Sequence, residues 1–283
     1  MATALMAAAL GTARARPLMA RGVTVGLPSG RAQVAGAKRF YDKVTVCRCD
    51  DAGAWEIRLD GRTLKTPTRR PLQFPNAKLA HAVALEWDAQ GGGGGVDPHA
   101  MPMMTIACTA IDNEHEGAAQ KQLLVEQLMP FLDTDTTCFF TKDDRKLLRK
   151  QERLWKPLHD WMAVEHAVLL STNRECAEIA FTPHPAEALD RVRATLNAMD
   201  MWTITAVHAL ALECKSLVIP LALHGRHIDV GQAVAAAHVD EEDQIERWGL
   251  VEGGHDHDRV NTDVSVASSS LLLWWLGADT DDE

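Results

Sequence analysis

The sequence predicts an α+β protein, in which a small N-terminal part with antiparallel strands and helices precedes a part made of helices. Two observations predict this class. Short runs that alternate apolar and polar residues occur soon after residue 40, and this is the period of a half-buried strand. From about residue 143, apolar residues recur every three or four positions, the period of a helix packed on one side. We therefore place an N-terminal α/β domain at residues 40–142 and a C-terminal helical domain at residues 143–278.

The first 39 residues have the composition of a mitochondrial presequence. No Asp or Glu occurs before Asp42, and arginines are spread through a segment that contains a single serine, Ser29. Arg-rich segments without acids are typical of organelle transit peptides, and the scarcity of serine favours the mitochondrion. Removing residues 1–39 would change the formal net charge from -10 to -16. A tail without function is the alternative interpretation.

The first strands are predicted around Val44 and from Trp55 onward. Trp55, Ile57 and Leu59 alternate with polar residues, and Asp60-Gly61 follows directly. An Asp-Gly pair after such a run favours a two-residue hairpin, because both turn positions need a positive φ. The expected pairs are Leu59 with Arg62 and Ile57 with Leu64.

Helices are expected next at residues 76–90 and 118–132. Asn76 can cap the first of them, in which Leu79, Val83 and Trp87 are spaced by four and so share one face. Residues 91–95 are five glycines. They lack the Lys-Ser or Lys-Thr that follows a phosphate-binding loop, so we expect a plain connector.

The second half is predicted to be a series of helices. The first begins at Asp143 or Asp144, and Pro157 should kink it or mark a new start. Asp200 and Asp229 can cap later helices, and the acidic residues 279–283 form a tail. The expected later helices cover residues 185–196, 200–217, 229–248 and 264–276.

Charge and motifs exclude several classes of function. A formal net charge of -10 disfavours nucleic-acid binding, which needs a basic surface to neutralise phosphates, and also disfavours an anionic membrane. No apolar run is long enough to span a bilayer, and the six cysteines form no metal-binding pair. Motifs for a nucleophile or a nucleotide are absent. We expect no catalytic residue, no cofactor and no bound metal.

One enzymatic alternative remains open. His255, His257 and Asp258 lie close together after two glycines, and alternating histidines on an extended segment could reach one ion. The alternative is therefore an organellar metal-dependent hydrolase, and metal analysis of the purified protein would separate it from a binding protein.

A predicted stripe between residues 234 and 248 has the composition of a binding surface. On one continuous helix, residues spaced by three and four would share a face, with a carboxylate among apolar neighbours. An unpaired charge there is costly, so either a basic group of this chain or a partner must supply the cation. We expect Glu242 to be solvated, and Trp87 and Trp248 to lie in the core. The stripe consists of Val234, Ala237, Glu241, Ile245 and Trp248.

Short segments along the chain resemble the mitochondrial ATP synthase assembly chaperones that hold the α subunit of the catalytic sector. The most recognisable run covers residues 59–67, Leu-Asp-Gly-Arg-Thr-Leu-Lys-Thr-Pro. The resemblance extends over about residues 38–276. Its other segments are Arg39-Phe40-Tyr41, Glu86-Trp87, Ala89-Gln90, Met101-Pro102, residues 109–112, Thr134-Asp135, Cys138, Gln151, residues 155–161, and Glu241, Gln244 and Trp248-Gly249.

The resemblance implies a non-enzymatic chaperone of the mitochondrial matrix with an orthogonal helical bundle as its second part. It implies that the protein binds the free α subunit, shields its β-facing surface and is released as the ring assembles. An acidic residue before the Gln-x-x-x-Trp-Gly run matters in this family, and Glu241 matches it, with Asp240 and Glu242 one position away on either side. The expected partner-binding residues of this monomer are Glu241, Glu242, Val234, Ala237 and Ile245.

Overall fold

The computed structural model describes residues 39–49, 53–91, 96–175, 183–250 and 255–277. All of them belong to one packed unit. The strands are β1 (Val44–Arg48), β2 (Trp55–Leu59), β3 (Arg62–Thr63) and β4 (Gln73–Phe74). The α-helices are α1 (Ala77–Asp88), α2 (Pro102–Glu116), α3 (Ala118–Asp133), α4 (Arg145–Glu165), α5 (Ala186–Ala198), α6 (Met201–Cys214), α7 (Val218–His224), α8 (Val230–Ala237), α9 (Val239–Trp248) and α10 (His255–Leu276). Short 3-10 turns occur at η2 (Pro98–Ala100), η3 (Thr136–Cys138) and η4 (Asn173–Glu175).

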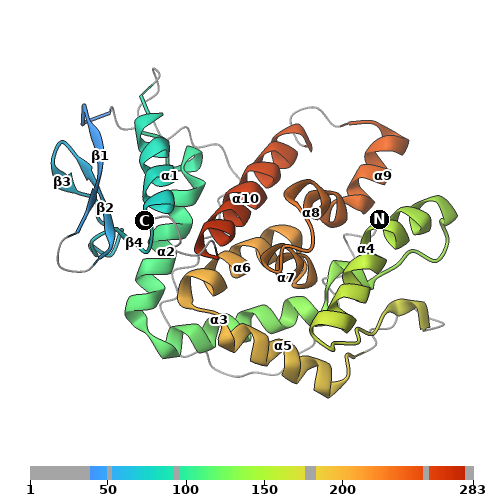
Figure 1. The fold of residues 1–283 in the computed structure, drawn as a ribbon. Coiled ribbons are helices and arrows are strands. Elements are labelled where there is room, and N and C mark those ends of the chain that lie inside the picture. The colour runs from blue at the N-terminus through green and yellow to red at the C-terminus, as the bar shows by residue number, and fades with distance from the viewer. Residues whose placement is uncertain (1–38, 50–52, 92–95, 176–182, 251–254, 278–283) are drawn as a thin grey trace, which may run out of the picture. The chain divides into compact units, whose positions relative to one another are not determined.

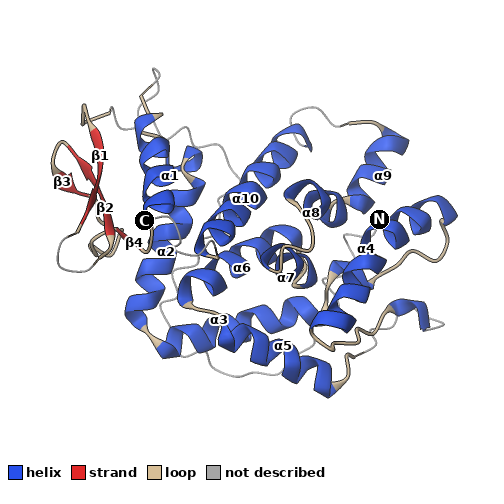
Figure 2. Ribbon diagram, viewed as in Figure 1, coloured by secondary structure: helices blue, strands red, loops and turns tan. Residues whose placement is uncertain are grey.

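The strands form one antiparallel sheet in which β2 pairs with β1, β3 and β4 (Figure 2). The predicted hairpin is confirmed: Asp60 and Gly61 have φ values of 47° and 80°. The Asp60 carboxylate also accepts from the backbone N–H of Asp42 and Lys43, which fixes the start of β1 against the turn. The predicted pairs are found, Leu59 opposite Arg62 and the N–H of Leu64 donating to the carbonyl of Ile57.

Helix α1 covers the sheet and follows its predicted pattern. The Asn76 side chain caps it by accepting from the N–H of Leu79. Leu79, Val83 and Trp87 are all buried, so the expectation that Trp87 lies in the core is confirmed. Helix α1 contacts β1, β2 and β4, and this packing gives the small sheet an apolar side.

Arg39 is part of the folded unit, although the predicted presequence ends at that residue. Its guanidinium donates to the backbone carbonyls of Tyr41, Asp42, Asp88 and Gln90, at distances between 2.8 and 3.1 Å. The carbonyls of Asp88 and Gln90 lie at the end of α1, where backbone acceptors lack helical partners. Cleavage after Arg39 would remove these bonds; the presequence and its end stay predictions.

Several helices follow their predicted starts. Asp144 caps α4 and Asp200 caps α6 through side-chain bonds to backbone N–H groups, Pro185 precedes α5, and α3 covers the predicted residues 118–132. Pro157 lies inside α4 and does not begin a new helix. Helix α2 was not predicted, although Pro102 at its first position is a common start signal.

Helix α6 runs through the core of the helical part. Nine of its residues are buried, and it contacts α2, α3, α7, α8 and α10 (Figure 1). Helices α2 and α3 precede the predicted boundary near residue 142, which stays a prediction, and they pack directly on α6. No helix in the described ranges is long and apolar enough to cross a membrane.

Candidate functional site

The predicted helix over residues 229–248 is two helices, α8 and α9, which meet at His238. His238 has φ -111° and ψ 14° and belongs to neither helix. The first turn of α9 carries Asp240, Glu241 and Glu242, and acids are favoured there because the N-terminus of a helix is its positive end. These three neighbouring acids are the sequence signal that could have predicted the start of a new helix here. The single stripe predicted from Val234 to Trp248 is therefore wrong as a continuous helical face.

The break nevertheless brings most of the predicted residues together around one hollow. Helix α10 supplies its far wall, because α10 packs against α8. This acidic hollow, as we name it, is lined by Val234, His238, Glu241, Glu242 and Ile245 from α8, α9 and their junction, and by Arg259, Thr262 and Asp263 from α10.

Two residues of the predicted stripe lie elsewhere. Ala237 is half-buried and packs against the core, and it does not line the hollow. Trp248 is 77% exposed at the end of α9, so the expectation that it lies in the core is wrong. Gly249 follows it and ends the helix with a φ of 83°.

The sequence did not predict that α10 lines the hollow, because the predicted last helix begins at Val264. The observed α10 begins at His255, so Arg259, Thr262 and Asp263 are helical. The Thr262 side chain is fixed on the side toward α6, because its hydroxyl donates a hydrogen bond to the Glu213 carboxylate at 2.7 Å. Val260 and Val264, which neighbour the lining residues in sequence, are 60% and 46% exposed and add apolar surface to this helix.

In the described part of the chain, the Glu241 carboxylate forms no ion pair with a lysine or an arginine, and its close partner is His238. Its carboxylate lies 2.8 Å from Nδ1 of His238, and its side chain is 40% exposed. A neutral imidazole can donate a hydrogen bond through Nδ1 without cancelling the negative charge. We expected the cation for Glu241 to come either from this chain or from a partner protein. Glu241 has a hydrogen-bond partner within the chain, His238, and its carboxylate is still accessible to a cation from another protein.

Glu242 is paired rather than merely solvated. Its carboxylate lies 2.9 Å from the Arg259 guanidinium, and its side chain is 40% exposed. This ion pair connects α9 to α10 across the hollow. Exposed pairs of this kind contribute little to stability, so Arg259 can exchange Glu242 for another carboxylate at low cost.

The opposite face of α9 is fixed against α4 by a network of polar contacts. Asp240 accepts from the Gln151 amide at 2.7 Å, and the buried Asp243 pairs with Lys150 at 2.9 Å and with Arg247 at 2.7 Å. Glu246 completes the network. Of the three neighbouring acids in the first turn, Asp240 therefore faces α4, whereas Glu241 and Glu242 face the hollow.

The electrostatics of the α4 side follow from these contacts. Hydrogen bonds from Lys146 and Lys150 lower the pKa of the Glu246 carboxyl to about 2. Burial raises the pKa of the Asp240 carboxyl, against the opposing effect of the Gln151 bond. The network favours the ionised form of Glu246 and disfavours that of Asp240.

The enzymatic alternative rested on His255, His257 and Asp258, whose side chains lie outside the described residues. Their backbone forms the first turn of α10, so they are not on an extended segment as that hypothesis required. Among the described side chains, no group of three or more His, Cys, Asp or Glu could hold a metal ion.

The described part of the chain combines a small antiparallel sheet, a larger set of helices and an acidic hollow with apolar walls. Comparison with known proteins then identifies the family. A family model described as ATP12 chaperone protein matches residues 38–163. The protein named atp12, mitochondrial, of Schizosaccharomyces pombe is 31% identical over 221 residues, which is 76% of each chain. ATP12, mitochondrial, of Saccharomyces cerevisiae is 23% identical over 274 residues, or 84% of each chain.

The fold has solved counterparts as well. The crystal structure of Atp12 from Paracoccus denitrificans superposes with a TM-score of 0.73 at 31% identity, covering 84% of this chain and 97% of that one. This chain belongs to the ATP12 chaperone family, and the family resemblance and the α+β fold predicted from the sequence are confirmed. The family is one of chaperones and not of enzymes. The family model ends at residue 163, before the helices that form the acidic hollow.

Proposed function

We propose that this protein is an assembly chaperone of the mitochondrial ATP synthase that binds the free α subunit in the matrix. It covers the surface of the α subunit that will later meet the β subunit, and it leaves as the ring assembles. Membership of the ATP12 chaperone family supports the chaperone role, and the mitochondrial names of the two yeast relatives support the compartment.

The observation that carries the binding site is the acidic hollow. Glu241 offers a carboxylate at 40% exposure, and Val234 and Ile245 line the same hollow as apolar walls. A basic side chain of the α subunit with apolar neighbours would fit this combination, because its cation can approach Glu241 while its stem packs on the walls. Charges placed in this way contribute more to specificity than to raw affinity.

The apolar surface near the hollow supports a protein partner. Val260 and Val264 of α10, Trp248 at the end of α9, and Leu250 just after it are exposed side chains of substantial size. Exposed aromatic and aliphatic residues rimmed by charge are the typical composition of an interface. A chaperone without an energy source needs such a moderate interface, since a later partner must be able to displace it.

Aggregation of the purified α subunit, with and without this chain, tests the proposal, and the β subunit serves as the control protein. We expect suppression of aggregation for the α subunit alone. The Glu241→Lys variant should keep the fold and weaken protection by about tenfold or more, because it puts a cation where the client's cation would bind. The matched variant is Glu116→Lys at the exposed end of α2, which makes the same change in net charge and should protect normally.

Equal protection of both subunits, or none of either, would contradict the proposed client. Normal protection by the Glu241→Lys variant would leave the chaperone role intact and remove the acidic hollow as its binding site. Circular dichroism of each variant confirms that the comparison is made between folded proteins.

A further inference from the structure

The loop between β3 and β4 is closed at its base by backbone bonds. The N–H of Thr66 donates to the carbonyl of Arg70 at 2.8 Å, and the N–H of Arg69 donates back to Thr66 at 2.8 Å. Lys65 and Pro71 form a bridge just outside these bonds. We call residues 65–70 the basic loop. Its backbone is specified by its own hydrogen bonds and therefore needs no partner to take this conformation.

Helix α2 fixes the loop to the body of the protein. One carboxylate oxygen of Asp112 accepts from the hydroxyls of Thr66 and Thr68, both at 2.6 Å. Thr66 is buried, so this anchor is partly shielded from water. Hydrogen bonds to a charged acceptor are stronger than neutral ones. The loop is thus held in one position relative to α2, which in turn packs on α6 and α10.

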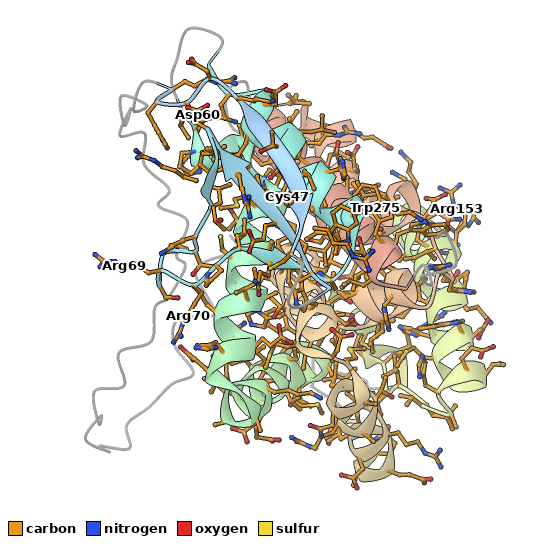
Figure 3. All side chains as sticks on the ribbon, turned by 60° about the vertical axis from the view of Figure 1, so that its left-hand side comes forward. Cys47, Asp60, Arg69, Arg70, Arg153 and Trp275 are labelled. Atoms are coloured by element: carbon orange, nitrogen blue, oxygen red, sulfur yellow. The ribbon has the colours of Figure 1, made fainter. Side chains whose placement is uncertain are left out.

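The anchored loop presents two arginines to solvent. Arg69 and Arg70 are exposed, as is Lys65, and Figure 3 shows both arginine side chains pointing away from the ribbon. Among the described residues, neither arginine has an acidic partner within salt-bridge distance. Arg69 has a φ of 69°, a left-handed conformation that glycine adopts without strain. The backbone bond from Arg69 to Thr66 holds this conformation, so the direction of the Arg69 side chain is set by the turn.

The charge of the loop is opposite to that of the surrounding chain. Residues 39–75 contain eight Lys or Arg and five Asp or Glu, whereas residues 76–283 contain sixteen basic and thirty-four acidic residues. An extended polyanion such as a nucleic acid, or an anionic bilayer, would be repelled by so acidic a chain. A short acidic segment on a folded protein can reach Lys65, Arg69 and Arg70 without approaching the acidic remainder of this chain.

We propose that the basic loop is a second docking point, at which Lys65, Arg69 and Arg70 bind an acidic segment of the client. This inference rests on the proposed function, since the client is the same α subunit that the acidic hollow would bind. Two contacts of opposite charge define the orientation of the client, because either reversed or shifted binding would place like charges together. The guanidinium forks of two neighbouring arginines suit carboxylates, which accept two parallel hydrogen bonds.

The affinity of the full chain for purified α subunit, measured at low and at moderate salt, tests this inference. The Arg69→Glu/Arg70→Glu double variant should bind at least about tenfold more weakly at low salt, and its affinity should depend less on salt. The matched control is Arg149→Glu/Arg153→Glu on α4, where both arginines are exposed and Arg153 is labelled in Figure 3. It makes the same change in charge and should bind within about twofold of the wild type.

The Arg69→Gly variant separates the side chain from the backbone. Glycine relieves the left-handed conformation, so the variant should melt at the same or a higher temperature and still bind more weakly. If the wild type binds the α subunit and both the glycine variant and the double variant bind it equally well, this inference alone is overturned. A wild type that does not bind the α subunit overturns the proposed function and this inference with it.

Weaker adhesion of the double variant to phosphatidylserine vesicles, with α binding unchanged, would assign the loop to lipid and overturn the proposal.

Discussion

The two faces of α9 carry the same kind of side chain in different environments. On the face toward α4, Asp243 is 2% exposed and pairs with two cations, and Asp240 is half-buried beside Gln151. On the face toward the hollow, Glu241 and Glu242 are each 40% exposed. The first face joins two helices, while the second presents carboxylates to solvent.

This difference shows how one acidic helix serves both folding and binding. A buried carboxylate must keep its cations, since an unpaired charge in the interior is costly. A half-exposed carboxylate has no such requirement and can change partners. Variants on the two faces should therefore separate stability from binding.

The largest effect is expected for Asp243→Ala. This substitution leaves Lys150, which is 21% exposed, without its buried partner, and it removes one of the two carboxylates bound by Arg247. Breaking a buried ion pair by removing one partner costs about 3 kcal/mol or more. Urea unfolding measures the loss. Glu246→Ala, which affects the exposed part of the same network, is the control and should change the unfolding midpoint much less; equal losses for the two would contradict the comparison.

A smaller effect that depends on pH is expected for Asp240→Asn. Burial raises the pKa of Asp240 above its usual 3.8. A carboxyl with a raised pKa stabilises the fold while it is protonated, below its unfolded pKa, and that contribution is lost as pH rises through the folded pKa. Asparagine does not titrate and can still accept from Gln151.

The advantage of the asparagine variant should therefore grow from pH 4 toward pH 8. Urea unfolding of both proteins across this range gives the difference directly. A difference that stays constant, or that shrinks as pH rises, would falsify the assignment of Asp240 to the α4 face. Glu126→Gln, an exposed position on α3, should show no such trend.

Local signals predicted much of the fold because they act within a few residues. The Asp60-Gly61 turn, the Asn76 cap and the Asp200 cap were each predicted and each found. Each involves a side chain or a turn whose physical effect reaches only one turn of helix or one strand pair. Periodicity alone missed the break at His238, because apolar residues continue on both sides of it.

The composition of the hollow was only half predictable. Val234, Glu241 and Ile245 follow from their spacing along the chain, although the helix breaks between Val234 and Glu241. The same spacing places Glu242 off the stripe, and only the family resemblance includes it in the binding set. Arg259 and Asp263 come from α10, and which helix faces α9 depends on packing against α6 and α8. The same packing decides that Asp243 is buried while Trp248, five residues later, is exposed, and no local pattern distinguishes them.

The smallest change in stability is expected for Glu241→Gln, and it tests the hollow face most directly. Glutamine keeps the size of the side chain and an oxygen that can accept from His238 Nδ1, which lies 2.8 Å from the carboxylate. Substitutions at partly exposed positions without buried charge change stability by at most about 0.5 kcal/mol. The urea midpoint should therefore stay near that of the wild type, whereas protection of the α subunit should fall because the carboxylate charge is gone. A clear loss of stability together with unchanged protection would show that Glu241, like Asp243, holds the helices together and that its exposure serves no client.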